Sequence, residues 1–400
     1  MNSICIKDNE TLLAASRIMQ GGGAMEEHGL PFRLALNLTH GDGFDLQNVE
    51  SLIKHLQSTT LQVDEVRITP PPANVGDEWM MQLCSALGTH PYLSILSFCV
   101  APESDPHFMT YMSETIRGAR NLVSLSCSGV VFSGETKDYL DFAAVLLDHP
   151  TLQDVSLTGS LEEGQCTSIN ANPVLAALAS IPNLNDLALS CFVPPMTESR
   201  SPFYELGGNP SLKTLDLVGT GGRGIIAASM AMKCSRSITT LWVDTSMKED
   251  ELYELGETIR HSQLESVHLY LDPFKDDDAM NTLIQALNGN PSLTKLAFVF
   301  HERENFFSND IQDAMISMLE HHNYTLRHIK FDLSTSIEVR NDYTEATIEY
   351  FLNLNRLGRN HLLTNPNASR DDWIACIAAA SGNLEAVHYF LSTNPSLCFA

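Results

Sequence analysis

The phrase NPSLKTLDL at residues 209–217 returns almost unchanged as NPSLTKLAF at 290–298. Looser copies stand at 90–98, as HPYLSILSF, and at 149–157, as HPTLQDVSL. All four share one pattern: Asn or His, then Pro, a leucine two residues on, and then two apolar residues separated by one position. Such alternation is typical of a short β-strand that buries one face, so the phrase predicts the start of a strand.

The leucine of this phrase recurs along most of the chain, with an isoleucine in one copy. Eleven anchor positions are spaced 26 to 33 residues apart, and they are Leu30, Leu61, Leu93, Leu122, Leu152, Leu184, Leu212, Ile238, Leu264, Leu293 and Leu326. Amphipathic stretches between them predict helices, most clearly at 137–149, 276–289 and 309–322. A sustained period of about thirty residues indicates a stacked array in which each repeat supplies one strand and one helix.

The Asn-Pro pair marks the place where a helix ends. Helices end readily at Gly or Asn in the left-handed conformation, and Pro cannot continue a helix. In LNGNPSL, at 287–293, Gly289 and Asn290 are expected to adopt that conformation, and Pro291 commits the chain to leave the helix. The leucine that follows then returns the chain to the core.

These repeats resemble the leucine-rich repeat family, in its long ribonuclease-inhibitor-like subtype, over residues 25–335. The resemblance implies an α/β solenoid shaped as a horseshoe, with a parallel sheet on the concave side and helices outside. One feature of the family is missing, namely the Asn or Cys three residues after the second strand leucine. Those positions hold Ala101, Val130, Ser160, Phe192, Thr220 and Ser246. The hydrogen-bonded ladder that the family builds there is therefore not carried over to this chain.

We expect three segments: an N-terminal cap at 1–25, an array of about eleven repeats at 26–340, and a C-terminal helical cap at 341–400. Caps are needed because the terminal repeats have a hydrophobic face without a neighbour. In the last segment, LNLNRLGRN resembles the closing segment of leucine-rich-repeat proteins of algae and other protists, and AAASGNLEAVHYFL resembles the helix–turn–helix of an ankyrin repeat. A docking surface anchored by an exposed Trp373 is the alternative to a purely structural cap.

Composition limits the class of partner and the compartment. Asp and Glu number 49 against 24 Lys and Arg, a formal charge of −25, which disfavours nucleic acids and anionic membranes and favours a basic partner. The nine cysteines are scattered without a CxxC pair, so we expect mostly buried thiols, a reducing compartment and cytoplasmic localisation. We find neither an export signal nor an apolar run long enough to span a membrane.

One stretch has the features of a dinucleotide-binding turn. Gly219, Gly221 and Gly224 form G-x-G-x-x-G between a predicted strand and a predicted helix, and Asp244 follows twenty residues after the last glycine. A leucine-rich repeat has the same order of strand, turn and helix, so glycines in its turn produce the pattern without a ligand. We therefore expect no cofactor, no metal and no catalytic residue, and a dinucleotide-dependent enzyme remains an alternative.

The residues between the buried strand positions are expected to face the concave side. The candidate partner-binding residues are three rings and three charged side chains: Trp242, His268, Tyr270, Asp216, Asp244 and Lys330. Neighbouring strands lie about 4.8 Å apart, so the rings should touch. Aromatic anchors with a polar surround are typical of binding hot spots. The competing interpretation is that the rings only fill the inside of a curved sheet, and the exposure of Trp242 distinguishes the two.

The sequence thus predicts a monomeric, non-enzymatic scaffold or adaptor that binds a protein partner on its concave face. The resemblance also implies two regulatory alternatives, because its subtype includes a small-GTPase activator and the sensing arms of innate-immune receptors. The chain has no G-x-S-x-G, H-E-x-x-H or P-loop motif that would favour catalysis.

Overall fold

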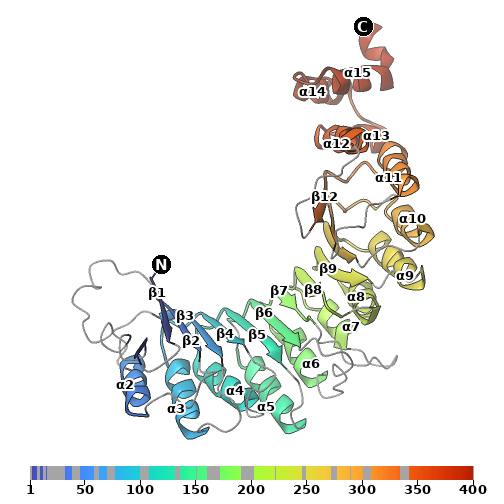
Figure 1. The fold of residues 1–400 in the computed structure, drawn as a ribbon. Helices are drawn as coiled ribbons and strands as arrows, with labels where there is room; N and C mark the ends of the chain where they lie inside the picture. Colours follow the sequence, from blue (N-terminus) through green and yellow to red (C-terminus); the bar gives the residue numbers. More distant parts are fainter. Residues whose placement is uncertain are drawn as a thin grey trace. The chain divides into compact units, whose positions relative to one another are not determined.

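The computed structural model describes residues 2–6, 10–11, 15, 32–37, 46–57, 63–69, 77–99, 108–130, 136–149, 151–159, 172–190, 202–220, 222–245, 249–271, 277–288, 290–300, 308–333 and 342–399. The chain divides into two compact units, Met1–Ile238 and Thr239–Ala400 (Figure 1).

The first unit alternates strands and helices along the chain. Its strands pair in parallel and in chain order, and they are β1 (Asn2–Ile6), β2 (Phe32–Asn37), β3 (Val63–Thr69), β4 (Ile95–Cys99), β5 (Ser124–Val130), β6 (Asp154–Gly159), β7 (Asp186–Ala188) and β8 (Thr214–Leu217). The helices are α2 (Leu46–Gln57), α3 (Asp77–Gly88), α4 (Phe108–Gly118), α5 (Thr136–Leu147), α6 (Asn172–Ser180), α7 (Pro202–Gly207) and α8 (Gly222–Cys234). In Figure 1 these described helices share one face of the sheet.

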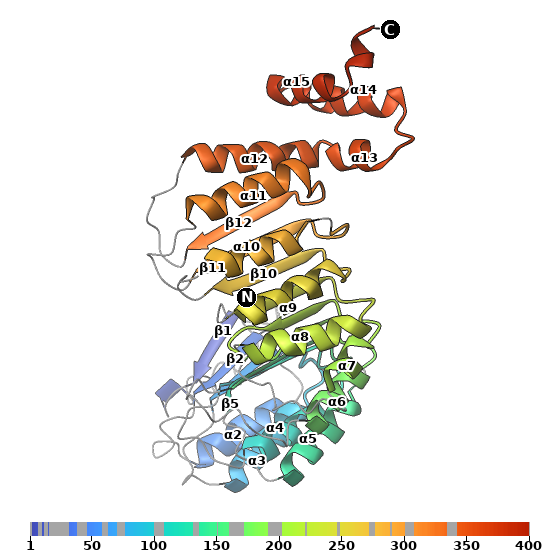
Figure 2. The ribbon, with the colours of Figure 1, turned by 90° about the vertical axis from the view of Figure 1, so that its right-hand side faces the viewer.

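The second unit continues the same alternation and ends in helices. Its strands also pair in parallel and in chain order, and they are β9 (Thr240–Thr245), β10 (Ser266–Leu271), β11 (Lys295–Phe300) and β12 (His328–Leu333). The helices are α9 (Glu249–Arg260), α10 (Asp277–Ala286), α11 (Asn309–His321), α12 (Asp342–Arg356), α13 (Arg359–Thr364), α14 (Arg370–Ala379) and α15 (Leu384–Thr393), followed by a 3₁₀ turn, Pro395–Phe399. Figure 2 shows α9, α10 and α11 stacked side by side.

The core consists of the residues that the repeat pattern predicts. All nine anchors within the described ranges, from Leu93 to Leu326, are at most 2% exposed. On the strands, alternate residues such as Leu215 and Leu217 are also buried, and Cys127 takes the place of a leucine. Because an apolar strand face and a helix stripe must cover each other, each repeat shields its neighbours. The predicted fold class, an α/β leucine-rich-repeat solenoid, is confirmed.

The three clearest helix predictions are confirmed as α5, α10 and α11, with ends that differ by up to three residues. Leu30 and Leu61 lie outside the described residues, and the predicted segment boundaries at 25 and 340 stay a prediction. The expectation of mostly buried thiols is wrong for the described part of the chain. Cys5, Cys234 and Cys398 are exposed, because they lie on the uncovered strand face or at element ends, whereas Cys84 and Cys127 are buried.

The Asn of the repeated phrase joins neighbouring repeats through its side-chain amide. Asn209 is buried, and its Oδ1 accepts the backbone N–H of Ser211 at 2.9 Å and of Leu212 at 3.3 Å. Its Nδ2 donates to the carbonyls of Ala179 at 3.0 Å and Ile181 at 2.9 Å, at the end of α6 in the preceding repeat. One amide therefore turns the chain into the next strand and also satisfies carbonyls that the helix end leaves unpaired.

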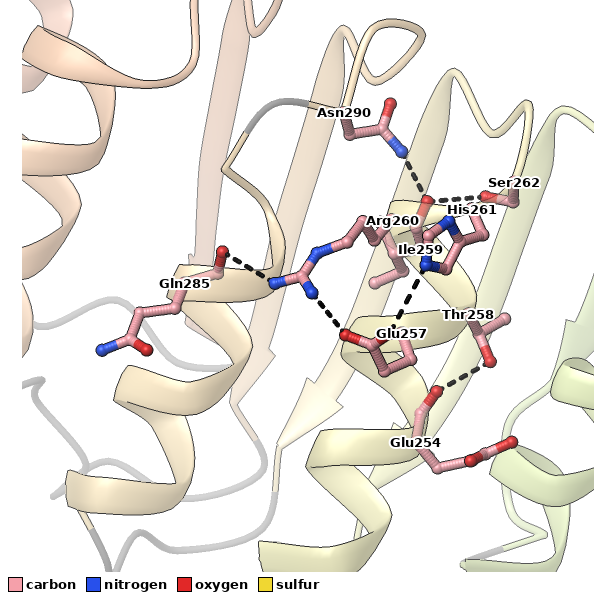
Figure 3. Close-up of polar contacts among 9 residues, drawn as sticks. All are labelled: Glu254, Glu257, Thr258, Ile259, Arg260, His261, Ser262, Gln285 and Asn290. Carbon is pink, nitrogen blue, oxygen red and sulfur yellow. Dashed lines mark hydrogen bonds and ion pairs between the residues drawn. The ribbon is translucent and has the colours of Figure 1, made fainter.

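Asn290 and Asn323 repeat this arrangement in the second unit. Asn290 donates to the carbonyl of Ile259, which also accepts the Ser262 hydroxyl at 2.9 Å (Figure 3). Asn323 donates to the carbonyl of Leu287 at 2.8 Å. Gly289 lies outside the described residues, and the role established for Asn290 is that of a side-chain bridge. A ladder of hydrogen bonds between repeats thus exists at the Asn that begins the repeated phrase, away from the position at which the family carries its own.

Arg359 is a buried cation that links the last repeat to the C-terminal helices. Its guanidinium lies over the rings of Tyr324, Phe351 and Tyr389, at 4.8, 5.3 and 5.9 Å from their centroids. Nε donates to Asn355 Oδ1 at 2.8 Å, and Nη2 donates to a backbone carbonyl of α11. This buried cation therefore connects α11, α12, α13 and α15.

Candidate functional site

The predicted rings lie together on the strand face opposite the helices of the second unit, which we call the open face. Trp242 of β9 is directly opposite His268 of β10, and Tyr270 follows two residues later on the same strand. The strand residues between them, such as Val243 and Leu269, are buried toward the helices. Because successive side chains of a strand point to opposite faces, the three rings point away from the helices. We call Trp242, His268 and Tyr270 the aromatic patch.

The rings of the patch are in direct contact. The indole of Trp242 stacks on the imidazole of His268, with centroids 3.6 Å apart and planes 5° from parallel. Tyr270 lies 6.2 Å from the indole at an angle of 36°. All three side chains are half-buried. The indole is therefore neither part of the core nor fully exposed, and the three rings form one cluster on two adjacent strands.

The environment of His268 keeps its ring neutral near pH 7. Burial lowers the pKa of His268, and the positive charges of Lys330 and Lys295 lower it further. A hydrogen bond of 3.1 Å joins Nε2 to the hydroxyl of Ser266 and holds the ring. A neutral imidazole stacks on the indole as an aromatic surface, and the two lysines provide positive charge beside it.

The three other predicted residues, Asp216, Asp244 and Lys330, can each be placed relative to the patch. Asp244 is opposite Tyr270 in register, and Lys330 is exposed on β12. Asp216 belongs to the first unit, where its Oδ1 accepts the backbone N–H of Val218 at 2.9 Å. Lys295 was missed by the sequence analysis. It occupies the first outward position of β11, one step before the positions that the analysis considered.

The open face of the first unit has different side chains. Ser97, Ser126 and Ser156 occupy the same row on β4, β5 and β6. Beside them, Asp154 and Asp186 are directly opposite each other on β6 and β7. Burial raises the pKa of Asp154, and so do its hydrogen bond to Asp186 and the charge of that neighbouring carboxylate. This described part of the first unit therefore presents small polar groups and carboxylates.

The glycines of the dinucleotide-like motif have structural roles. Gly219 has a φ of 81°, which favours glycine, in the turn after β8. A Cβ at Gly224 would lie 1.9 Å from the Thr220 hydroxyl, which itself donates to the carbonyl of Leu217. Gly221 lies outside the described residues. A dinucleotide-binding fold has helices on both faces of its sheet, whereas the described helices here share one face.

The alternative of a docking surface anchored by an exposed Trp373 is wrong, because the indole is only 8% exposed and belongs to the core of the C-terminal helices. The exposed large apolar residues among the described C-terminal helices are instead Leu363, Ile374 and Leu384. Leu384 is the first residue of α15, directly after the N-cap Asn383. A sequence pattern does not separate the two cases, since both lie in apolar helical stretches.

The described residues give no support for a metal site or a membrane-spanning helix. They contain no group of three or more His, Cys, Asp or Glu side chains placed to hold a metal ion. No described helix is both long and apolar enough to cross a membrane.

Comparison with known proteins gives only distant structural likeness. No family model matches the chain, and no curated protein matches it. Leiomodin-1 actin-binding site 2 is similar with a TM-score of 0.28 and 15% identity, over 49% of this chain and 95% of that one. The structure of the Rad7 and Elc1 complex in yeast is similar with a TM-score of 0.33 and 15% identity, over 83% of this chain and 92% of that one. Likeness at this level carries no argument about what the chain binds.

Proposed function

We propose that the chain is a non-enzymatic protein-interaction scaffold or adaptor that binds a partner on the open face of its second unit. The observation that carries the proposal is the contact of Trp242, His268 and Tyr270 on a face that the described helices leave uncovered. Three half-buried rings on adjacent strands form an apolar surface with little side-chain freedom left to lose on binding.

The energetics of interfaces favour this patch as the anchor. Trp and Tyr are enriched among interface hot spots, and truncation of one such residue costs about 2 kcal/mol or more of binding free energy. The charged residues around the rings, Asp244, Lys295 and Lys330, suit the polar rim of an interface, where charge sets partner choice and association rate. Asp216 remains a proposed contact of the first unit.

Several finer features belong to the same proposal. The ribonuclease-inhibitor-like subtype is supported by repeats of about thirty residues that carry an α-helix. Cytoplasmic localisation is supported by the seven free cysteines of the described residues. A monomer, and a basic partner without nucleic acid or membrane, are supported by the net charge of −25. Caps at 1–25 and 341–400 complete the proposed organisation. Regulation of a small GTPase, an immune-type sensing arm and dinucleotide binding have no specific observation in their favour.

A comparative capture experiment tests the proposal. Wild-type chain, the double variant Trp242→Ala/Tyr270→Ala and the control Tyr253→Ala would be used as bait, with bound proteins identified by mass spectrometry. Tyr253 is 57% exposed on α9, so its replacement removes an exposed aromatic ring from a helix. We expect partners to be lost with the double variant and retained with the control. An unchanged set of partners with the double variant would contradict the proposal, provided that its circular dichroism matches wild type.

A further inference from the structure

An open trough of about 610 Å³ lies between α12 and α15 of the second unit. Its walls come from two helices, with Ala346, Thr347 and Tyr350 on α12 and Leu384, Glu385 and His388 on α15. Within each helix the outer two residues are four apart, so one stripe of each helix faces the trough. A volume in this range is ordinary for a site that receives one or two side chains of a ligand.

Arg359 contacts both of the helices that form the walls of the trough. Its guanidinium contacts the ring of Phe351 on α12 and the ring of Tyr389 on α15. These rings are the sequence neighbours of Tyr350 and His388, which line the trough. Because a buried cation connects the two helices at this level, the trough is preformed, and a ligand need not order its walls.

The described lining of the trough is acidic. Among the described residues that line it, Glu385 is the one carboxylate, and none is Lys or Arg. Burial raises the pKa of the Tyr350 phenol, and the negative potential of Glu385 and Tyr389 raises it further, against an opposing effect of Arg359. Among the described residues Glu385 forms no ion pair within 4.0 Å. The carboxylate therefore remains available to a cationic ligand group.

Leu384, an exposed apolar residue, is adjacent to Glu385 in the sequence. Leu384 is 83% exposed, more than any other large hydrophobic residue that the structure describes. The residue before it, Asn383, caps the helix by accepting the N–H of Ala386 at 3.0 Å, so Leu384 is fixed at the rim. An exposed leucine next to a carboxylate fits a ligand that carries both an apolar and a cationic side chain.

We propose that this trough binds a segment of another protein in which Arg or Lys is adjacent to an apolar side chain. The cationic group lies between the Glu385 carboxylate and the Tyr350 ring, where it gains a charge-assisted hydrogen bond and a cation–π contact. The apolar neighbour covers Leu384. Acidic segments and nucleic-acid phosphates are repelled by the same carboxylate. The site is separate from the aromatic patch and does not depend on it.

Fluorescence polarisation with two short labelled peptides tests this assignment on the full chain. One peptide alternates Arg and Leu, and its matched partner has Glu in place of every Arg. We expect the Arg peptide to bind, with affinity that falls as salt is raised, and the Glu peptide to bind about tenfold more weakly or not at all. Equal binding of both peptides, or binding of neither, would overturn the proposal.

Three variants locate the peptide on the surface. Glu385→Gln and Leu384→Ser are each expected to weaken the Arg peptide by about five- to tenfold, the effect of one charged or apolar contact. Glu320→Gln removes the same charge from α11, outside the lining of the trough, and should change binding by less than about twofold. If Glu320→Gln weakens binding as much as Glu385→Gln does, the peptide senses only the net charge, and the proposed site is wrong.

Discussion

Neighbouring repeats are joined at the same position of the repeated phrase by two kinds of side chain, a histidine in the first unit and asparagines in both units. In the first unit, His149 uses Nε2 to donate to the carbonyl of Ile116. In the second unit, the amides of Asn290 and Asn323 make the equivalent bond and also accept the N–H groups that start the next strand. An amide donates and accepts at any ordinary pH, whereas imidazole does both only when neutral. The histidine and asparagine bridges thus hold the same backbone geometry, and only the histidine bridge is expected to weaken at low pH.

Their open faces differ as well. Small residues such as Ser126 and Ser156 line the first unit, where Asp154 and Asp186 supply carboxylates. The second unit carries the aromatic patch with lysines at its border. Large rings bury more area per residue than serine does, so we expect a partner to gain more binding free energy from the second unit. The repeat therefore fixes the scaffold, and a few outward residues decide where binding free energy is available.

The largest effect is expected from Arg359, which only the second unit contains. Arg359→Met removes the donors to Asn355 and α11 and leaves buried acceptors unpaired, so we expect a loss of about 3 kcal/mol or more in unfolding free energy. Urea denaturation and hydrogen exchange of α11–α15 would measure it. The matched control is Arg356→Met, which breaks an ion pair with the exposed Glu349 and should cost less than about 1 kcal/mol. Equal losses would contradict the role of Arg359 as an internal connector.

A smaller effect separates the asparagine bridges of the two units. Asn209→Ala removes a donor from two carbonyls of the preceding repeat, and we expect a cost of about 2–3 kcal/mol. Asn290→Ala should cost about 1 kcal/mol less, because the Ile259 carbonyl keeps the hydroxyl of Ser262 as a donor. Chemical denaturation of both variants measures the difference. A larger loss from Asn290→Ala would show that the acceptor side of the bridge dominates.

The sequence predicts the scaffold well because every repeat carries the same pattern of strand and helix residues. Nine described anchors such as Leu152 and Leu293 are buried, and a period of about thirty residues sets the strand register that places Trp242 opposite His268. The role of Asn290 was identified only in part. A local pattern shows that a helix ends there, but the bridge to Ile259 spans thirty-one residues and depends on how repeats stack.

Side-chain exposure near the end of the chain was harder to predict. Trp373 and Leu384 both lie in apolar helical stretches, yet the first is buried and the second is exposed. Which side of α14 or α15 is covered depends on the packing around Arg359. The repeats give no guide here, because the C-terminal helices do not follow the repeated pattern. Lys295 was missed for a simpler reason, since the first outward position of each strand was not considered.

The smallest predicted effect is a change of unfolding free energy with pH, and it distinguishes the histidine bridge from the asparagine bridge. Burial lowers the pKa of His149, against smaller opposite effects of its bond to Ile116 and of the Asp148 charge. The unfolded chain therefore binds the proton more readily. The stability that neutral His149 contributes is complete above the ordinary histidine pKa of about 6.5, and it falls as pH drops from there toward the lower folded value.

His149→Asn should remove this dependence, because an amide fits the bridge without titrating. Relative to wild type, the variant is expected to gain up to about 1 kcal/mol in unfolding free energy between pH 7.5 and pH 5. The reciprocal change, Asn323→His, should introduce the same loss into the second unit, where the buried Asn323 donates to Leu287. Hydrogen exchange of the amides in α4 and α10, the helices whose ends accept the two bridges, reads each bridge separately at the two pH values. If both variants follow the wild-type pH profile, the histidine and asparagine bridges do not differ in their tolerance of acid.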